Sequence, residues 1–195
     1  MEVRPARGEE VPQLAAMLAR AFQDDPVTAW FIRNEQRRPK YATRYFAWQL
    51  HRLIGQEQVH VASDASGAAL WALPGRWRES TWQALRLFVA LIPTLVTHLP
   101  TATTGVDRVE KRHPPEPHLY LAVLGTDPPA QGRGIGTSLL RPGLELCDRE
   151  GLPAYLESSK ESNVAFYGRF GFRVTEEVRM PGGGPSVWLM WRDPS

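Results

Sequence analysis

The feature that most constrains the fold is a dense apolar segment that runs into a glycine-rich turn and then into a helix-like pattern. Residues 118–126 read HLYLAVLGT, and AQGRGIGTSLL follows after a short proline-containing link. An uninterrupted apolar segment of this kind is typical of a strand at the centre of a sheet. We predict a strand at 118–126, a helix at 133–150 and a strand at 153–158. Because a helix joins the two strands, they are expected to run parallel.

The remaining elements are predicted in mixed order. Strands are expected at 2–7, 58–63, 68–75, 171–180 and 186–193, and helices at 8–22, 26–34, 41–55, 163–170 and from Glu79 to about Arg112 with breaks at Pro93 and Pro100. This order favours an α/β (α+β) fold with a mostly antiparallel sheet and helices on both faces. The sequence shows no repeat and no long linker, so we expect a single domain over residues 1–195.

Charge, cysteine content and hydropathy exclude several classes of protein. The net charge is +2 and the densest basic run, RNEQRRPK at 33–40, is short, so no nucleic-acid partner is expected. Cys147 is the single cysteine, which rules out an intrachain disulfide, and the five histidines lack metal-ligand spacing, so we expect no metal. The longest apolar stretch, 85–99, is too short to span a bilayer, and the charged start of the chain is unlike a secretory signal. We therefore expect a cytoplasmic protein without a membrane partner.

The glycine-rich turn has the character of an anion site. Gly132, Gly134 and Gly136 permit backbone conformations and a close approach that a Cβ would hinder, and Arg133 adds a permanent charge. Unpaired N–H groups and the helix dipole at the start of the helix favour a phosphate-sized anion. The spacing fits neither the dinucleotide-binding fingerprint nor the phosphate loop of nucleotide hydrolases. A tight structural turn without a ligand is the simpler alternative.

Two motifs in order resemble a known family. Gln131, Gly134 and Gly136 form the pattern Q-x-x-G-x-G, and ESNVAFYGRFGFRV follows at 161–174. Together they resemble the signatures of the GCN5-related N-acetyltransferase (GNAT) superfamily. The likeness covers Glu116–Trp191 and is greatest to the group that contains puromycin N-acetyltransferase and its actinobacterial relatives.

The resemblance implies a fold and a co-substrate. The GNAT fold has a mixed, mostly antiparallel sheet of about seven strands, in which a splayed parallel pair binds acetyl-CoA. Residues 1–115 would form the acceptor side and residues 116–195 the acetyl-CoA side. The pyrophosphate would lie on the glycine-rich turn and the pantetheine arm along the central strand. The expected cofactor contacts are Leu124, Gly125, Thr126, Gln131, Gly132, Arg133, Gly134, Ile135, Gly136, Thr137, Asn163 and Phe166.

The resemblance also implies catalytic roles. Tyr167 would protonate the departing thiolate, which a phenol of pKa about 10 can do in the transition state. The attacking amine must be neutral, which at pH 7 costs about 4.6 kcal/mol for a lysine-like amine and about 1.4 kcal/mol for an α-amine. Glu157 is the best candidate for the general base because it lies on the second strand of the parallel pair. Glu116, His118 or a water chain are the alternatives.

The acceptor is expected to be the primary amine of a small molecule of the aminonucleoside or antibiotic kind. Direct attack in a ternary complex is expected, because Cys147 has no histidine near it in the sequence. The acid Asp25 would suit a cationic acceptor. Acetylation of a protein or peptide N-terminus or lysine is the alternative, as is an acyl-CoA-binding regulatory domain without turnover, and a homodimer is possible. The expected acceptor contacts are Phe22, Asp25, Trp30, Trp71 and His118, with Phe31, Trp77 and Trp82 as further aromatic candidates that could equally pack in the core.

Overall fold

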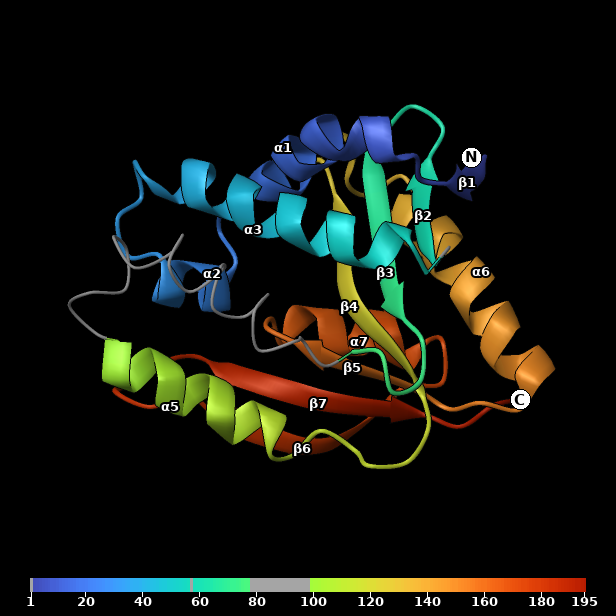
Figure 1. Cartoon of the computed structure of the whole chain (residues 1–195). Helices are drawn as coiled ribbons and strands as arrows, with labels where there is room; N and C mark the ends of the chain where they lie inside the picture. The colour runs from blue at the N-terminus through green and yellow to red at the C-terminus, as the bar shows by residue number, and fades with distance from the viewer. Residues whose placement is uncertain (1, 57, 78–98) are drawn as a thin grey trace.

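The computed structural model describes residues 2–56, 58–77 and 99–195, and its strands form one sheet in the order β1-β2-β3-β4-β5-β7-β6 (Figure 1). Neighbouring strands are antiparallel except β4 and β5, which run parallel as predicted. The predicted fold class is therefore confirmed. The strands are β1 (Val3–Pro5), β2 (Val59–Ala62), β3 (Gly67–Ala72), β4 (Leu119–Thr126), β5 (Ala154–Ser158), β6 (Arg173–Arg179) and β7 (Ser186–Arg192).

The helices also lie close to their predicted ranges. They are α1 (Val11–Ala21), α2 (Pro26–Phe31), α3 (Arg38–Ile54), α5 (Leu99–Glu110), α6 (Ile135–Glu150) and α7 (Ser162–Gly168). The helix predicted from residue 79 is described only from residue 99 onwards, so Trp82 and Pro93 lie outside the described residues. In the described part of the chain, none of the helices has the length and apolar character that crossing a membrane requires.

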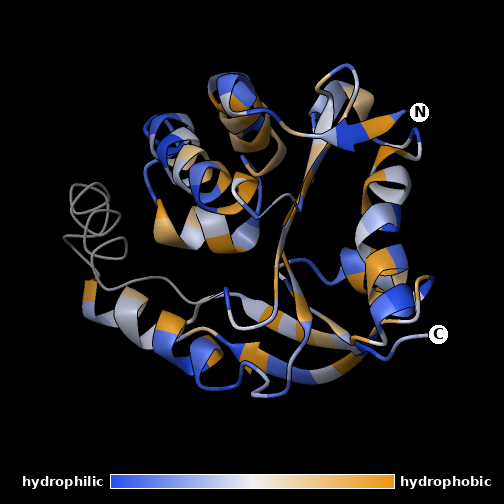
Figure 2. Ribbon diagram, turned by 45° about the vertical axis from the view of Figure 1, so that its right-hand side comes forward, coloured by the Kyte–Doolittle hydropathy of each residue, from blue (hydrophilic) through white to orange (hydrophobic). Residues whose placement is uncertain are grey.

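Helices cover both faces of the sheet. Figure 2 shows the upper strands nearly edge-on, with α1 and α3 on one side and α6 on the other. The α1 cluster, with Leu14 and Leu70, packs α1 and α3 against β2 and β3. The α6 cluster, with Leu139 and Leu156, fills the opposite face beneath α6 and α7. A third group, the α5 cluster with Leu189, packs α5 against β6 and β7.

A β-bulge in β4 changes which face its side chains meet. Leu70 pairs with Val123 and Trp71 pairs with Leu121, so Ala122 is the extra residue on β4. As a result Leu121 packs in the α6 cluster, whereas Val123 packs in the α1 cluster. Regular alternation would have placed both on one face.

The two parallel strands separate soon after they meet. Pairing between β4 and β5 ends at Leu121 and Leu156, although β4 continues to Thr126. Among the described residues no strand pairs with β4 beyond this point on its β5 side. The backbone of 122–126 on that edge is therefore open to an extended ligand.

Candidate active site

The glycine-rich turn joins the end of β4 to the start of α6. Gly132 and Gly134 have φ of 77° and 78°, the left-handed region that glycine enters at little cost, and Gly134 is the N-cap of α6. The Gln131 side-chain amide donates a hydrogen bond to the Thr126 carbonyl at 3.1 Å, which ties the turn to the strand. The first turn of a helix leaves its N–H groups without intrahelical acceptors, so those of residues 135–137 are available to an anion.

Two predicted cofactor residues meet Gly136 in the first turn of α6. A Cβ added to Gly136 would lie 3.4 Å from Phe166 Cζ and 4.0 Å from Leu124 Cδ2. Helix α7 and strand β4 therefore converge on this turn. Arg133 is exposed beside it, and Asn163 is half-buried in the first turn of α7.

Three other predicted cofactor residues differ in what they face. Gly125 faces α1, because a Cβ there would lie 2.6 Å from Leu18 Cδ2. Ile135 is buried in the α6 cluster, and Thr137 lines a groove between α6 and α7. Gly125 and Ile135 can therefore meet a ligand only through their backbone.

Tyr167 lies on the α6 side of the sheet. It is buried in the α6 cluster, and its ring centroid is 5.2 Å from that of Phe166 and 5.9 Å from that of Phe172. Burial raises the pKa of the Tyr167 phenol above its ordinary value, so the phenol keeps its proton at neutral pH. Its hydroxyl bonds to none of the described residues, which leaves this proton available to a ligand.

Glu157 lies on β5 directly after the last residue that pairs with β4. Its carboxylate accepts hydrogen bonds from the Tyr120 and Tyr155 hydroxyls, both at 3.2 Å. Burial, followed by the charge of Glu157, raises the pKa of both phenols, so they remain donors. The carboxylate is thus held from two sides while its side chain keeps 20% of its surface exposed.

A histidine pair extends this network into the protein. His113 Nδ1 lies 3.6 Å from Glu157 Oε1, and His113 Nε2 lies 2.9 Å from His118 Nε2. The Trp77 ring stacks on His113 with the centroids 3.4 Å apart. Sequence reasoning missed His113, Tyr120 and Tyr155. Alternation along strands 118–126 and 153–158 was the available signal, since it sets His118, Tyr120, Tyr155 and Glu157 on one face.

Glu157 and Tyr167 flank the opening between β4 and β5 from opposite sides. Leu156 packs with Tyr167 in the α6 cluster, and the next residue along a strand points to the other face. A proton acceptor thus stands on the α1 side of the opening and a proton donor on the α6 side. The open edge of β4 borders this opening, and the glycine-rich turn adjoins α7 on the Tyr167 side.

Known proteins share parts of this sequence and its fold. The model of the acetyltransferase (GNAT) family matches residues 102–172. An uncharacterized N-acetyltransferase of Schizosaccharomyces pombe is 29% identical over 215 residues, which cover 100% of this chain and 84% of that protein. These matches identify an acetyltransferase of the GNAT type. This GNAT protein is accordingly an N-acetyltransferase that depends on acetyl-CoA.

Two further comparisons bear on the fold and on part of the sequence. The GNAT chain aligns with a Corynebacterium glutamicum structure described as histone acetyltransferase HPA2 and related acetyltransferase, with a TM-score of 0.73 and 23% identity over 99% of this chain and 96% of that one. N-alpha-acetyltransferase 50 of Danio rerio is 36% identical over 62 residues, 30% of this chain and 37% of that protein. The narrower resemblance to the puromycin group stays a prediction.

The predicted acceptor residues of this GNAT protein do not line a common binding surface. Phe22 packs on Phe46 at 5.0 Å between ring centroids, on the α1 side. Asp25 is buried: its carboxylate caps α2 by accepting from the Thr28 N–H at 2.8 Å and also accepts from the Ser159 hydroxyl. Both oxygens therefore have partners within the protein.

Trp30 and Trp71 lie in the core. Trp30 is wedged between α5 and the loop before β7, where a Cβ at Gly105 or Gly184 would lie 2.8 or 2.6 Å from its ring. Trp71 has no exposed surface and lies beneath α6, where a Cβ at Gly143 would overlap its ring. The placement expected for Trp71 is thus corrected: β3 turns this side chain to the α6 face, away from Glu157.

Glu116 and His118, the alternative candidates for the general base, differ in exposure. The Glu116 residue is exposed, and its backbone carbonyl, 2.6 Å from His118 Nδ1, is the part that joins the network. His118 is buried, and burial lowers the pKa of its imidazole. His118 is therefore less open to an acceptor than Glu157, whereas the exposed Glu116 joins the network only through its backbone.

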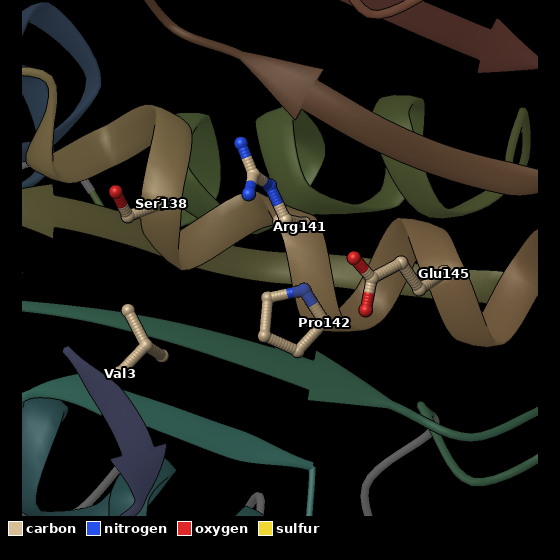
Figure 3. Close-up of a pocket in the computed structure, with 5 residues that line it drawn as sticks. All are labelled: Val3, Ser138, Arg141, Pro142 and Glu145. Atoms are coloured by element: carbon tan, nitrogen blue, oxygen red, sulfur yellow. The ribbon is translucent and has the colours of Figure 1, made fainter. Parts of the chain in front are cut away.

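Two hollows flank α6. One, of about 360 Å³, runs between α6 and the end of α7 and is lined by Thr137, Arg141, Arg169 and Phe170 near the glycine-rich turn, with Asp148 at its other end. The second, of about 150 Å³, lies between β1 and α6, where Val3 faces Pro142 (Figure 3). Within the described residues no group of three or more His, Cys, Asp and Glu side chains is placed to hold a metal ion.

Proposed function

We propose that this protein transfers the acetyl group of acetyl-CoA to the primary amine of a small molecule by direct attack in a ternary complex. The observation on which the proposal rests is that Glu157 and Tyr167 stand on opposite sides of the opening between β4 and β5. An acetyl thioester laid through that opening would meet an amine near Glu157 and would leave its sulfur near Tyr167.

Acetyl-CoA would be held mainly by backbone groups. The N–H groups at the start of α6 and the exposed Arg133 suit the pyrophosphate. The pantetheine arm would pair with the open edge of β4 at 124–126, with Asn163 as a further polar contact. Arg141 and Arg169 line the groove between α6 and α7, and their charges favour the phosphorylated nucleotide at that end.

The chemistry requires one proton to leave the amine before the C–N bond forms. Glu157 would accept that proton, which matters most for an alkyl amine because deprotonation at pH 7 then costs about 4.6 kcal/mol. As the C–S bond breaks, the Tyr167 phenol would supply a proton to the thiolate. Two phenols donate to the Glu157 carboxylate, which supports its role as the proton acceptor, and burial keeps the Tyr167 phenol protonated, which supports its role as the donor.

The alternative acceptor is the amino group of a peptide or protein. The partial match to N-alpha-acetyltransferase 50 is the observation that favours it. An α-amine is easier to deprotonate, by about 3 kcal/mol relative to a lysine-like amine, and so depends less on a base such as Glu157. The hydrogen bonds from Tyr120 and Tyr155 that hold the Glu157 carboxylate therefore favour an alkyl amine as the acceptor.

The test is thiol release by the purified full chain from acetyl-CoA with a panel of amines. The panel should contain alkyl, arylalkyl and aminonucleoside amines, short peptides with free N-termini, and lysine peptides. We expect small amines to exceed peptides in kcat/KM by about tenfold or more, a transition-state difference of about 1.4 kcal/mol. Peptides as the better acceptors would establish the alternative. Acetyl-CoA binding without thiol release for any amine would indicate a regulatory binding domain.

Replacement of the proposed acid sharpens the test. Tyr167→Phe is expected to lower kcat by about 10²-fold, the usual contribution of general acid catalysis, with acetyl-CoA affinity by calorimetry changed less than about twofold. Tyr41→Phe is the matched control, because Tyr41 is a buried tyrosine in the α1 cluster away from the opening. An unchanged kcat in Tyr167→Phe would contradict the assigned role.

A further inference from the structure

The hydrogen-bond chain behind Glu157 has a definite order of protons. A carbonyl oxygen can only accept, so the 2.6 Å contact with the Glu116 carbonyl requires the proton of His118 to be on Nδ1. Burial lowers the pKa of His118, so this imidazole is neutral and its Nε2 is an acceptor. His113 Nε2, 2.9 Å away, must then carry the proton of that contact.

This order leaves His113 Nδ1 as the atom that faces Glu157. With Nε2 protonated, Nδ1 is a lone pair in neutral His113 and an N–H donor in the imidazolium. It lies 3.6 Å from Glu157 Oε1, and the His113 side chain is only 2% exposed. The His113 ring is thus shielded from bulk water, and a proton can reach Nδ1 through the partly exposed Glu157 when the two groups close from 3.6 Å to hydrogen-bond distance.

We propose that His113 is a positioning residue that acts through Glu157: it receives the proton that Glu157 takes from the amine and so returns the carboxylate to its basic form. The inference rests on the proposed function, because it assumes an amine acceptor at Glu157. His118 fixes the tautomer of His113, and Trp77 holds the ring in place by stacking on it.

The step balances as follows. The acceptor enters as R–NH₃⁺ and loses one proton to Glu157, which passes it to His113 Nδ1 and leaves an imidazolium–carboxylate pair. The neutral amine forms the C–N bond and the C–S bond breaks. The second amine proton goes to the regenerated Glu157 carboxylate, and Tyr167 gives its proton to the thiolate. The products are R–NH–COCH₃ and the free thiol; of the two protons now on His113 and Glu157, one is equivalent to that which Tyr167 regains from solvent and the other is the net proton released. That proton leaves to solvent through Glu157 after the products depart.

The groups around His113 are compatible with this role. Stacking by Trp77 and edge contacts with Tyr120 and Tyr155 surround its ring, and an aromatic face favours a cation. The titratable groups that face it are Glu157 and Tyr155 from β5 and Tyr120 and His118 from β4 and its approach. Arg112, next in the chain, is exposed and paired with Glu176 of β6 at 2.6 Å.

The test compares two acceptors of similar size that differ in basicity: the fastest alkyl amine of the panel and its β,β,β-trifluorinated analogue, which is largely neutral at pH 7. His113→Phe keeps a ring beneath Trp77 but cannot hold a proton. We expect kcat for the alkyl amine to fall by about tenfold or more, part of the 10²–10⁴-fold that general base catalysis supplies, and kcat for the fluorinated amine to fall by less than about threefold. Glu157→Gln should show the same contrast with a larger loss.

The pH profile supplies a second readout. The loss caused by His113→Phe should shrink as pH rises, because an amine that is already neutral in solution needs no acceptor for its proton. His60→Phe is the matched control: His60 is half-buried on β2 and its Nε2 has no hydrogen-bond partner in the described chain. It should leave both acceptors unchanged. If His113→Phe does not fold, His113→Asn with added imidazole replaces it, and imidazole should restore kcat for the alkyl amine.

Two outcomes would overturn the proposal. Equal losses on both acceptors at every pH would assign His113 a purely structural role, and no loss on either would remove it from the reaction. A wild-type chain that acetylates no amine would instead overturn the proposed function itself. That result is recognised before any variant is made.

Discussion

At the scale of a single residue, surroundings decide whether a reactive side chain takes part in chemistry. Glu157 and Cys147 are both reactive types, but Glu157 opens toward the separated strands whereas Cys147 has no exposed surface and lies in the α6 cluster. Burial, the largest cause, raises the pKa of the Cys147 thiol to about 11. This supports direct transfer over an acyl-cysteine intermediate, because the nucleophilic form is the thiolate.

Cys147 should therefore resist thiol reagents in the folded protein. At pH 8 the thiolate fraction of a group with pKa about 11 is about one in a thousand, and access adds a further barrier. We expect labelling by a chromogenic disulfide reagent to proceed only as fast as the chain unfolds, and to reach one thiol per chain in denaturant. Rapid stoichiometric labelling of the native protein would contradict this burial.

At the scale of an element, α6 shows how a helix is matched to the strand beneath it. Pro142 lies inside the helix and removes the N–H that would bond to the Ser138 carbonyl. One residue later, Gly143 lets the backbone rest directly on the Trp71 ring. The glycine is required by packing, because Trp71 fills the space that a Cβ would occupy.

Gly143→Ala should therefore destabilise the protein by about 2 kcal/mol or more, since overpacking forces Trp71 or α6 to move. Gly168→Ala is the control: it lies in α7, has no positive φ and has nothing within 4 Å of the added Cβ, so removing a helical glycine there should be neutral or stabilising by about 0.5 kcal/mol. Chemical denaturation of both variants measures the difference. Equal effects at the two positions would show that helix propensity, and not the Trp71 contact, sets the cost.

At the scale of the whole molecule, Arg192 joins the last strand of the sheet to helix α6 and to the turn that follows α7. Arg192 of β7 forms two hydrogen bonds with Asp148 of α6, at 2.7 and 2.9 Å, and its Nε donates to the Phe170 carbonyl at 2.8 Å. The Arg192 guanidinium is the main reason that the pKa of Asp148 is lowered to about 2. The pair therefore stabilises the folded chain most when Asp148 is ionised.

This coupling predicts acid sensitivity. Because the folded pKa of Asp148 lies below its ordinary value of 3.8, its contribution is fully present above about pH 4 and is lost as pH falls toward 2. Asp148→Asn should lower the free energy of unfolding by about 1–2 kcal/mol at pH 7, and this difference should shrink to near zero at pH 2. Denaturant titrations at several pH values measure it. Glu145→Gln, on the exposed side of the same helix, should differ from wild type by less than about 0.5 kcal/mol, and a pH-independent loss in Asp148→Asn would contradict the coupling.

The sequence by itself determined the local elements and the class of the fold. The periodicity of apolar residues located the described helices and strands within a few residues, and the order strand–helix–strand at 118–158 required the parallel pair. The left-handed glycines of the turn and Glu157 on β5 were also visible, since both depend on positions a few residues apart. These properties are local, so a linear pattern contains them.

Only the tertiary structure decided which side chains meet. The bulge at Ala122 reverses alternation in β4, and Trp71 on β3 faces α6 although its residue type suggested an acceptor wall. His113 reaches Glu157 from 44 positions away in the chain, a contact that no local pattern signals. Such contacts arise from strand register and helix placement, which are set by the packing of the whole core, and for that reason the partners of Glu157 could not be read from the sequence.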